Sequence, residues 1–253
     1  MTVYLTAHEN CMMKTTLINL LLAALLSNIV ATADMTKSRE MRQERLEMIR
    51  EQIERRGITD PRVLKAMREV PRHLFVPPAL RSKAYSDRPL AIGEGQTISQ
   101  PYIVALMTES LSLTPTSRIL EVGTGSGYQA AILAAMAGVV YTIEIKKPLY
   151  QQADRTLRAL EFENIHTRLG DGYYGWDSQE RFDAIMITAA VDHIPPPLLH
   201  QLKDGGRLVL PLGNPFSYQN LVMVTKNDQD FTVKQIIGVL FVPMTGYALD
   251  RKR

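Results

Sequence analysis

A turn rich in glycine, Gly123-Thr124-Gly125-Ser126-Gly127, carries the strongest chemical signal in this sequence. Glycine lets a chain turn sharply from a strand into a helix, and it lets a ligand approach the backbone closely. The dinucleotide pattern Gly-x-Gly-x-x-Gly would require a third glycine at position 128, where Tyr128 stands. The turn therefore favours a nucleoside ligand without a pyrophosphate, and S-adenosyl-L-methionine fits that description. A purely structural glycine turn is the alternative.

Two acidic residues follow the turn at spacings that suit a nucleoside. Glu144 ends a predicted strand about twenty residues after the first glycine, where an acid accepts hydrogen bonds from ribose hydroxyls. Asp171, in Gly170-Asp171-Gly172, follows the next strand and is placed to accept from an adenine amino group. The alternatives are a solvated acid at a strand end for Glu144 and an ordinary Asp-Gly turn for Asp171.

Alternating strands and helices from residue 117 onward would position these groups. The apolar pattern predicts strands at 118–122, 139–145, 165–169, 182–188 and 207–212, with helices at 128–137, 148–160 and 197–202. Two further β-rich stretches, 220–225 and 233–242, close the chain. This order predicts an α/β fold with a doubly wound, mostly parallel, seven-stranded Rossmann-like sheet. The carboxyl ends of parallel strands meet at one edge, so the turn and both acids should line one crevice.

The residues before this region are predicted to form helices and a long connection. The spacing of Leu46, Ile49 and Ile53 indicates an amphipathic helix over 36–57, ended by Gly57. A second helix should begin at Asp60-Pro61 and end before Pro71, and a third should span 101–111. Residues 73–100 have no long periodic run. We therefore expect N-terminal helices with a loop covering the substrate and cofactor at 34–100, and a cofactor-binding domain with C-terminal strands at 101–253.

Residues 1–33 are predicted to be a leader outside the fold. Lys14 precedes an apolar run from Leu17 to Val30, and Ala31-Thr32-Ala33 follows, which is the pattern of a secretory signal peptide. The run is short for a membrane span, so no stable membrane association is expected. A disordered tail is the alternative. Because adenosylmethionine is a cytosolic metabolite, we expect a cytoplasmic protein, with export to the periplasm as the alternative.

Composition excludes several classes of function. The only cysteine, Cys11, leaves no internal disulfide, and a net charge of +3 is too small to indicate nucleic-acid binding. His193 and His200 have no partner cysteine or clustered acid, so no metal site is expected. Ser126 is not a hydrolase nucleophile, because Thr124 stands where the nucleophile elbow requires glycine.

Several motifs together resemble the protein-L-isoaspartate O-methyltransferases. They are Val70-Pro-Arg72, Gln96-Thr-Ile-Ser99-Gln-Pro101, Leu120-Glu-Val-Gly-Thr-Gly-Ser-Gly-Tyr128, Gly170-Asp-Gly172, Phe182-Asp-Ala-Ile185, Thr188-Ala-Ala190, Gly205-Gly-Arg-Leu-Val-Leu-Pro-Leu-Gly213 and Phe241-Val-Pro243. The resemblance covers about residues 40–245. One departure is Tyr102, which stands where animal members often have histidine and so carries no assigned role.

The resemblance implies roles for individual residues. Ser99 matches the active-site serine of the family, and Ala189 with Thr188 matches the strand end beside the sulfonium. The positions expected to contact S-adenosyl-L-methionine are Thr97, Ile98, Glu121, Gly123, Thr124, Gly125, Gly127, Glu144, Asp171, Gly172 and Thr188.

The implied reaction is methyl transfer to the free carboxylate of isoaspartyl residues in damaged proteins. A carboxylate is already ionised at neutral pH, so no general base is required, and Ser99 is interpreted as a hydrogen-bond donor that orients it. We expect a monomer whose partners are isoaspartyl proteins and peptides. The rival interpretations are a methyltransferase for small molecules or RNA, and a nucleoside-binding module without catalysis.

Overall fold

The computed structural model describes residues 36–177, 180–228 and 230–250. The predicted leader, residues 1–33, lies outside the described residues. The chain divides into two compact units, Met1–Glu44 and Arg45–Arg253, and the sheet and all the residues considered below for a site belong to the second. The domain boundaries predicted from the sequence stay a prediction.

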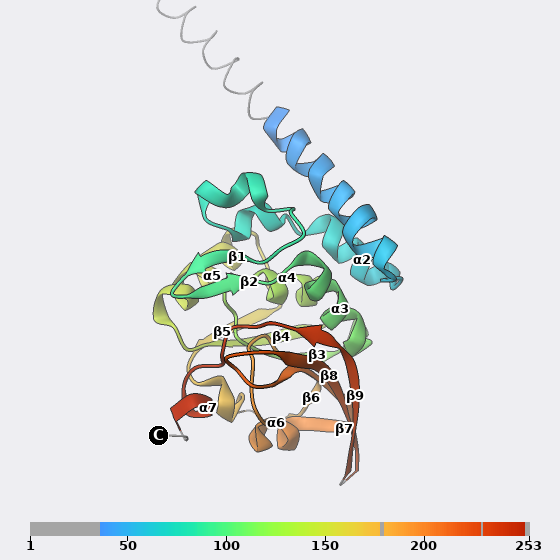
Figure 1. Cartoon of the computed structure of the whole chain (residues 1–253), viewed down its shortest axis with the longest axis vertical. Helices are drawn as coiled ribbons and strands as arrows, with labels where there is room; N and C mark the ends of the chain where they lie inside the picture. The colour runs from blue at the N-terminus through green and yellow to red at the C-terminus, as the bar shows by residue number, and fades with distance from the viewer. Residues whose placement is uncertain (1–35, 178–179, 229, 251–253) are drawn as a thin grey trace, which may run out of the picture. The chain divides into compact units, whose positions relative to one another are not determined.

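A seven-stranded sheet with the order β5-β4-β3-β6-β7-β8-β9 forms the centre of the second unit (Figure 1). Five neighbouring strands, from β5 to β7, are parallel, and β8 and β9 are antiparallel additions. The predicted mostly parallel seven-stranded sheet is therefore confirmed. The strands are β3 (Arg118–Val122), β4 (Val139–Glu144), β5 (Ile165–Leu169), β6 (Phe182–Ile187), β7 (Leu202–Gly213), β8 (Gln219–Asn227) and β9 (Asp230–Val239).

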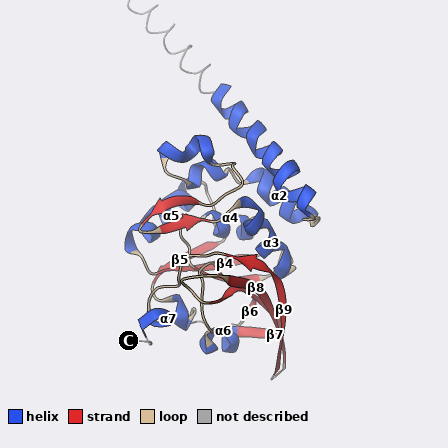
Figure 2. Ribbon diagram, viewed as in Figure 1, coloured by secondary structure: helices blue, strands red, loops and turns tan. Residues whose placement is uncertain are grey.

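Helices cover both faces of this sheet (Figure 2). The covering of both faces explains why the central strand β6 is apolar at every position except Asp183. Leu120, Ile185 and Leu208 have no exposed surface and pack in one core cluster. The helices are α2 (Pro61–Glu69), α3 (Pro101–Leu111), α4 (Tyr128–Ala134), α5 (Lys147–Ala159), α6 (Pro196–Gln201) and α7 (Tyr247–Asp250).

Helix α2 begins at Asp60-Pro61, as predicted. The Asp60 side chain accepts a hydrogen bond of 2.8 Å from the backbone N–H of Arg62, and Pro61 takes the first helical position. The preceding helix is less regular than predicted. Residues 36–48 are α-helical, but a π-helical turn, η1 (Ile49–Ile53), and a 3-10 turn, η2 (Glu54–Arg56), follow before Gly57 ends the run with a φ of 93°. Ile49 and Ile53 are buried, whereas Leu46 is 39% exposed.

The connection over 73–100 contains regular structure that the sequence pattern did not reveal. Two 3-10 helices, η3 (Arg72–Phe75) and η4 (Pro78–Lys83), precede an antiparallel hairpin of β1 (Leu90–Gly93) and β2 (Gln96–Ile98). Glu94 and Gly95 join the two strands, both at positive φ (52° and 70°), which matches a tight hairpin turn. Strands of four and three residues are too short to show the alternation by which a strand is recognised.

The predicted limits of three elements were wrong. Helix α4 ends at Ala134 rather than 137, because residues 135–138 turn so that Gly138 lies against the backbone of Pro115 and Thr116. Strand β7 begins at Leu202, where a helix was predicted. Strand β9 ends at Val239 rather than 242, and the following residues leave the sheet. The helix α7 was not predicted.

Candidate active site

A small cleft of about 60 Å³ opens at the carboxyl ends of the central strands. Strand β3 lies between β4 and β6, so the strand order reverses there, and open α/β sheets bind ligands at such a reversal. Six residues predicted to bind the cofactor line this cleft: Thr97, Gly123, Gly125, Glu144, Gly172 and Thr188.

The glycine turn forms one wall of the cleft, and its first glycine is required by a close contact. Gly123 has a φ of 101°, and a Cβ there would lie 2.4 Å from the Thr188 hydroxyl oxygen. That hydroxyl donates a hydrogen bond of 2.6 Å to the carbonyl of Gly123. The contact holds the end of β6 against the turn after β3, and it leaves no room for a side chain at position 123.

Glu144 places a carboxylate in the cleft, in direct contact with the glycine turn. Its Oε2 accepts a hydrogen bond of 2.8 Å from the backbone N–H of Gly125. Its Oε1 accepts one of 2.9 Å from the backbone N–H of Lys146. A carboxylate has about four acceptor sites, so two remain for the hydroxyls of a ribose. The same contacts fix the position of the glycine turn relative to β4.

Glu121 and Thr124 lie behind the cleft and do not line it. Glu121 is fully buried, and its Oε2 accepts a hydrogen bond of 2.5 Å from Thr142, whose hydroxyl lies 2.6 Å from that of Thr124. Burial raises the pKa of Glu121 to about 8; the bond from Thr142 opposes the rise, and the charge of Glu144 adds to it. These two residues support the glycine turn from behind.

The Asp171 side chain accepts hydrogen bonds from two backbone N–H groups. Its Oδ1 accepts a hydrogen bond of 2.9 Å from the N–H of Tyr173, and its Oδ2 accepts one of 2.8 Å from the N–H of Tyr247. The cleft is lined by the next residue, Gly172. The adenine role predicted for Asp171 stays a prediction. Ile98 is buried beside the cleft, and Gly127 caps α4, where a Cβ would lie 3.3 Å from Leu157.

Ser99 lines a second cavity, of about 640 Å³, next to the first. The two share Thr97, Val242 and Pro243 as common wall. The position of Ser99 depends on Arg72, whose side chain is fully buried. The Arg72 Nη2 donates a hydrogen bond of 2.8 Å to the Ser99 carbonyl, and its Nε donates one of 2.7 Å to the Ala84 carbonyl. Burial lowers the pKa of Arg72 to about 10, which leaves it charged at neutral pH.

The part of the wall formed by residues 242–245 was missed by the sequence prediction. Residues 242–245 cross the ends of the parallel strands, where two backbone hydrogen bonds to Ala190 hold them. The N–H of Ala190 donates to the Val242 carbonyl (2.8 Å), and the N–H of Met244 donates to the Ala190 carbonyl (2.9 Å). The Phe241-Val-Pro243 motif was the available signal, but its place in space depends on long-range contacts.

The part of the chain that the structure describes contains no group of three or more His, Cys, Asp or Glu side chains arranged to hold a metal ion. None of the helices in the described part of the chain is long and apolar enough to cross a membrane.

The sheet order, the glycine turn after the first central strand and the acid at the end of the second define the class of protein. The chain has the Rossmann-like fold of the class I S-adenosylmethionine-dependent methyltransferases.

Comparisons with known proteins identify the family. Residues 42–249 match the family described as Protein-L-isoaspartate(D-aspartate) O-methyltransferase (PCMT). A protein-L-isoaspartate O-methyltransferase 2 of Shewanella sediminis is 68% identical over 202 residues, covering 80% of this chain and 83% of that protein. A protein-L-isoaspartate O-methyltransferase of Opitutus terrae is 52% identical over 225 residues, covering 89% and 96%. The chain therefore belongs to the protein-L-isoaspartate O-methyltransferase family.

Solved structures agree with this family. One named protein-L-isoaspartate O-methyltransferase superimposes with a TM-score of 0.74 at 29% identity, covering 82% of this chain and 68% of that one. A protein of the same description from Plasmodium falciparum, solved in complex with S-adenosyl-L-homocysteine, gives a TM-score of 0.66 at 27% identity, covering 77% and 95%.

Proposed function

We propose that the protein transfers a methyl group from S-adenosyl-L-methionine to the free carboxylate of L-isoaspartyl residues in damaged proteins. The observation that carries this proposal is the pair of adjoining cavities. The inner cleft has the glycine turn and Glu144, the outer cavity has Ser99, and Thr97, Val242 and Pro243 belong to both. A donor in the inner cleft and an acceptor in the outer cavity can therefore lie next to each other.

The residues of the inner cleft fit this cofactor. A backbone cradle without side chains at Gly123 and Gly125 suits the methionine part, and the Glu144 carboxylate suits a ribose that bears two free hydroxyls. When bound, S-adenosyl-L-methionine supplies a methyl group on a sulfonium; an ionised carboxylate attacks it directly, and the sulfur keeps the electron pair of the broken bond.

Ser99 orients the acceptor in this proposal. Its hydroxyl donates a hydrogen bond to the isoaspartyl carboxylate and aligns one oxygen with the inner cleft. Since the carboxylate is ionised at neutral pH, the chain needs to supply no base. Arg72 binds the Ser99 backbone carbonyl, so that the backbone of this serine is positioned before the substrate arrives.

The apolar wall excludes water. Val242, Pro243 and Met244 cover the cleft beside Thr188 and Ala189. The reaction neutralises two opposite charges, so a dry site accelerates it.

The compartment and assembly belong to the same proposal. We infer that the protein acts in the cytoplasm, where adenosylmethionine is supplied. We also propose that it is a monomer that acts on isoaspartyl proteins, without nucleic acid and without stable membrane association. Determining the N-terminal sequence of the protein purified from fractionated cells tests this, because a mature start at Asp34 in a periplasmic fraction would reverse the assignment.

The decisive assay compares two peptides of identical sequence, one with isoaspartate and one with normal aspartate. With methyl-labelled S-adenosyl-L-methionine, we expect label in the isoaspartyl peptide alone. Equal labelling of the two would overturn the proposal, and so would labelling of RNA or small metabolites in place of the peptides. Cofactor binding without any transfer would favour a nucleoside-binding module.

A further inference from the structure

The outer cavity beside Ser99 has an uncharged, largely apolar lining. None of the described residues that line it is Asp, Glu, Lys or Arg. Two of its apolar side chains, Phe216 and Leu240, are each 77% exposed. Large apolar side chains this exposed leave unburied area that a partner can cover. Here the two belong to one cavity, which also contains the predicted active-site residue.

A buried polar side chain connects the two segments that carry these residues. Gln219 is fully buried, and its Nε2 donates to the carbonyls of Asn214 (2.7 Å) and Ser217 (2.6 Å). Its Oε1 accepts a hydrogen bond of 2.8 Å from the N–H of Phe241. The turn that bears Phe216 and the segment that bears Leu240 are therefore tied to each other through one amide.

The turn itself is also fixed. The Asn214 side chain accepts a hydrogen bond of 2.9 Å from the N–H of Phe216, and the Asn214 carbonyl accepts one of 3.1 Å from the N–H of Ser217. Tyr218 lies directly against Gly238, where any Cβ would overlap its ring. Phe216 is thus presented on a preformed backbone, and ordering on binding costs less there than in a free loop.

These surroundings favour an apolar group beside the reacting carboxylate. The isoaspartyl carboxylate needs only the space next to Ser99, which leaves the Phe216 and Leu240 side of the cavity for a neighbouring residue of the same chain. A charged neighbour would lose water without gaining a partner, because no lining side chain carries an opposite charge.

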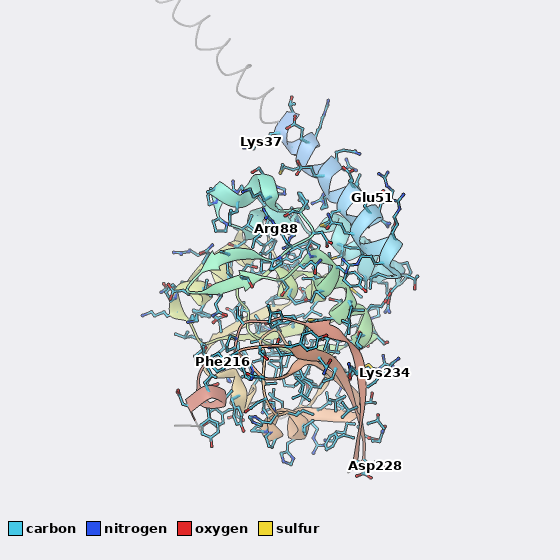
Figure 3. The ribbon with its side chains drawn as sticks, viewed as in Figure 1. Lys37, Glu51, Arg88, Phe216, Asp228 and Lys234 are labelled. Atoms are coloured by element: carbon cyan, nitrogen blue, oxygen red, sulfur yellow. The ribbon has the colours of Figure 1, made fainter. Side chains whose placement is uncertain are left out.

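We propose that Phe216 and Leu240 form an apolar clamp that binds the side chain of a residue flanking the isoaspartate, so that the enzyme prefers damaged sites with an aliphatic or aromatic neighbour. The inference rests on the proposed methyl transfer. Figure 3 shows Phe216 at the opposite end of the β7–β9 strands from the hairpin tip at Asp228.

The test uses three isoaspartyl peptides that differ only at the flanking positions: leucine before the isoaspartate, leucine after it, or serine at both. For the unaltered protein, we expect kcat/KM for at least one leucine peptide to exceed that for the serine peptide by about tenfold. Replacement of both Phe216→Ala and Leu240→Ala should bring this ratio to about one, mainly by raising KM for the leucine peptide.

Two variants serve as matched controls. Phe231→Ala removes a phenylalanine that is 39% exposed on β9 and outside the cavity, and it should keep the ratio. Phe216→Leu keeps an apolar side chain and should keep most of it. A ratio unchanged in the double alanine variant, or equal rates for all three peptides with the unaltered protein, overturns the clamp. Absence of methylation on every isoaspartyl peptide instead overturns the proposed function.

Discussion

The carboxylate of Glu144 accepts a hydrogen bond of 2.8 Å from the backbone N–H of Gly125, which joins the end of β4 to the glycine turn after β3. Two predicted parts of the cofactor site are therefore one structural unit. The bond also means that Glu144 is ordered before a ligand binds, so that hydroxyl groups find their acceptor already in place.

Replacement Glu144→Ala should weaken binding of S-adenosyl-L-methionine by about tenfold or more, because a hydrogen bond to a charged group contributes roughly 1.5–3 kcal/mol. Calorimetric titration of the cofactor measures the dissociation constant. Glu69→Ala, which removes an exposed acid on α2, is the matched control and should leave it unchanged. An unaltered constant for Glu144→Ala would remove this residue from the ribose site.

Replacement of Gly123 by alanine should be more damaging than the positive φ of this residue alone would make it, because a Cβ would also meet Thr188. Gly123→Ala places a methyl group 2.4 Å from the Thr188 hydroxyl oxygen and should abolish cofactor binding as well as destabilise the fold. Gly205→Ala is the control: its φ is 72°, but a Cβ there meets nothing within 4 Å. We expect Gly205→Ala to cost about 1 kcal/mol of unfolding free energy with normal binding. Equal cofactor affinity in the two variants would contradict the assigned role of the contact.

Replacement Ser99→Ala should slow turnover of an isoaspartyl peptide by an amount equivalent to about 1–3 kcal/mol, the range for the loss of a buried hydrogen-bond partner. Cofactor affinity should stay nearly normal, because Ser99 lines the outer cavity and not the inner cleft. Single-turnover transfer of a labelled methyl group separates the two quantities. Normal turnover in this variant would take the hydroxyl out of the mechanism.

The central sheet and its glycine turn could be predicted because their signals are local. The apolar run of β6 and the Asp60-Pro61 start of α2 each show their structure within a few residues. The hairpin of β1 and β2 could not be predicted in the same way, since its strands are too short to carry a period.

The candidate cofactor-binding residues were predicted as a set from the motifs, but the burial of each residue could not be predicted. Glu121 and Gly123 lie two positions apart in one motif, yet one is buried behind the cleft and the other lines it. The wall formed by Val242 and Met244 depends on their pairing with Ala190, some fifty residues earlier, and no local pattern encodes that contact.

The raised pKa of Glu121 predicts how stability depends on pH. Its folded pKa is about 8, above the ordinary value of 4.5, so between these values the folded protein holds a proton that the unfolded chain has released. The stabilisation is fully present below about pH 4.5 and is lost as the pH rises through about 8. The unfolding free energy should therefore fall by roughly 1 kcal/mol per pH unit across this window from this group alone.

Urea unfolding between pH 5 and 8.5 measures this slope, and Glu121→Gln should remove it, because an amide keeps the shape of the neutral acid and has no proton to lose. Glu69→Gln, at an exposed position, should keep the slope of the unaltered protein. Parallel profiles for Glu121→Gln and the unaltered protein would mean that Glu121 is ionised in the folded state. The folded state would then contain two negative carboxylates near the glycine turn, Glu121 and Glu144, and the hydrogen bond that Thr142 donates to Glu121 would stabilise the ionised form.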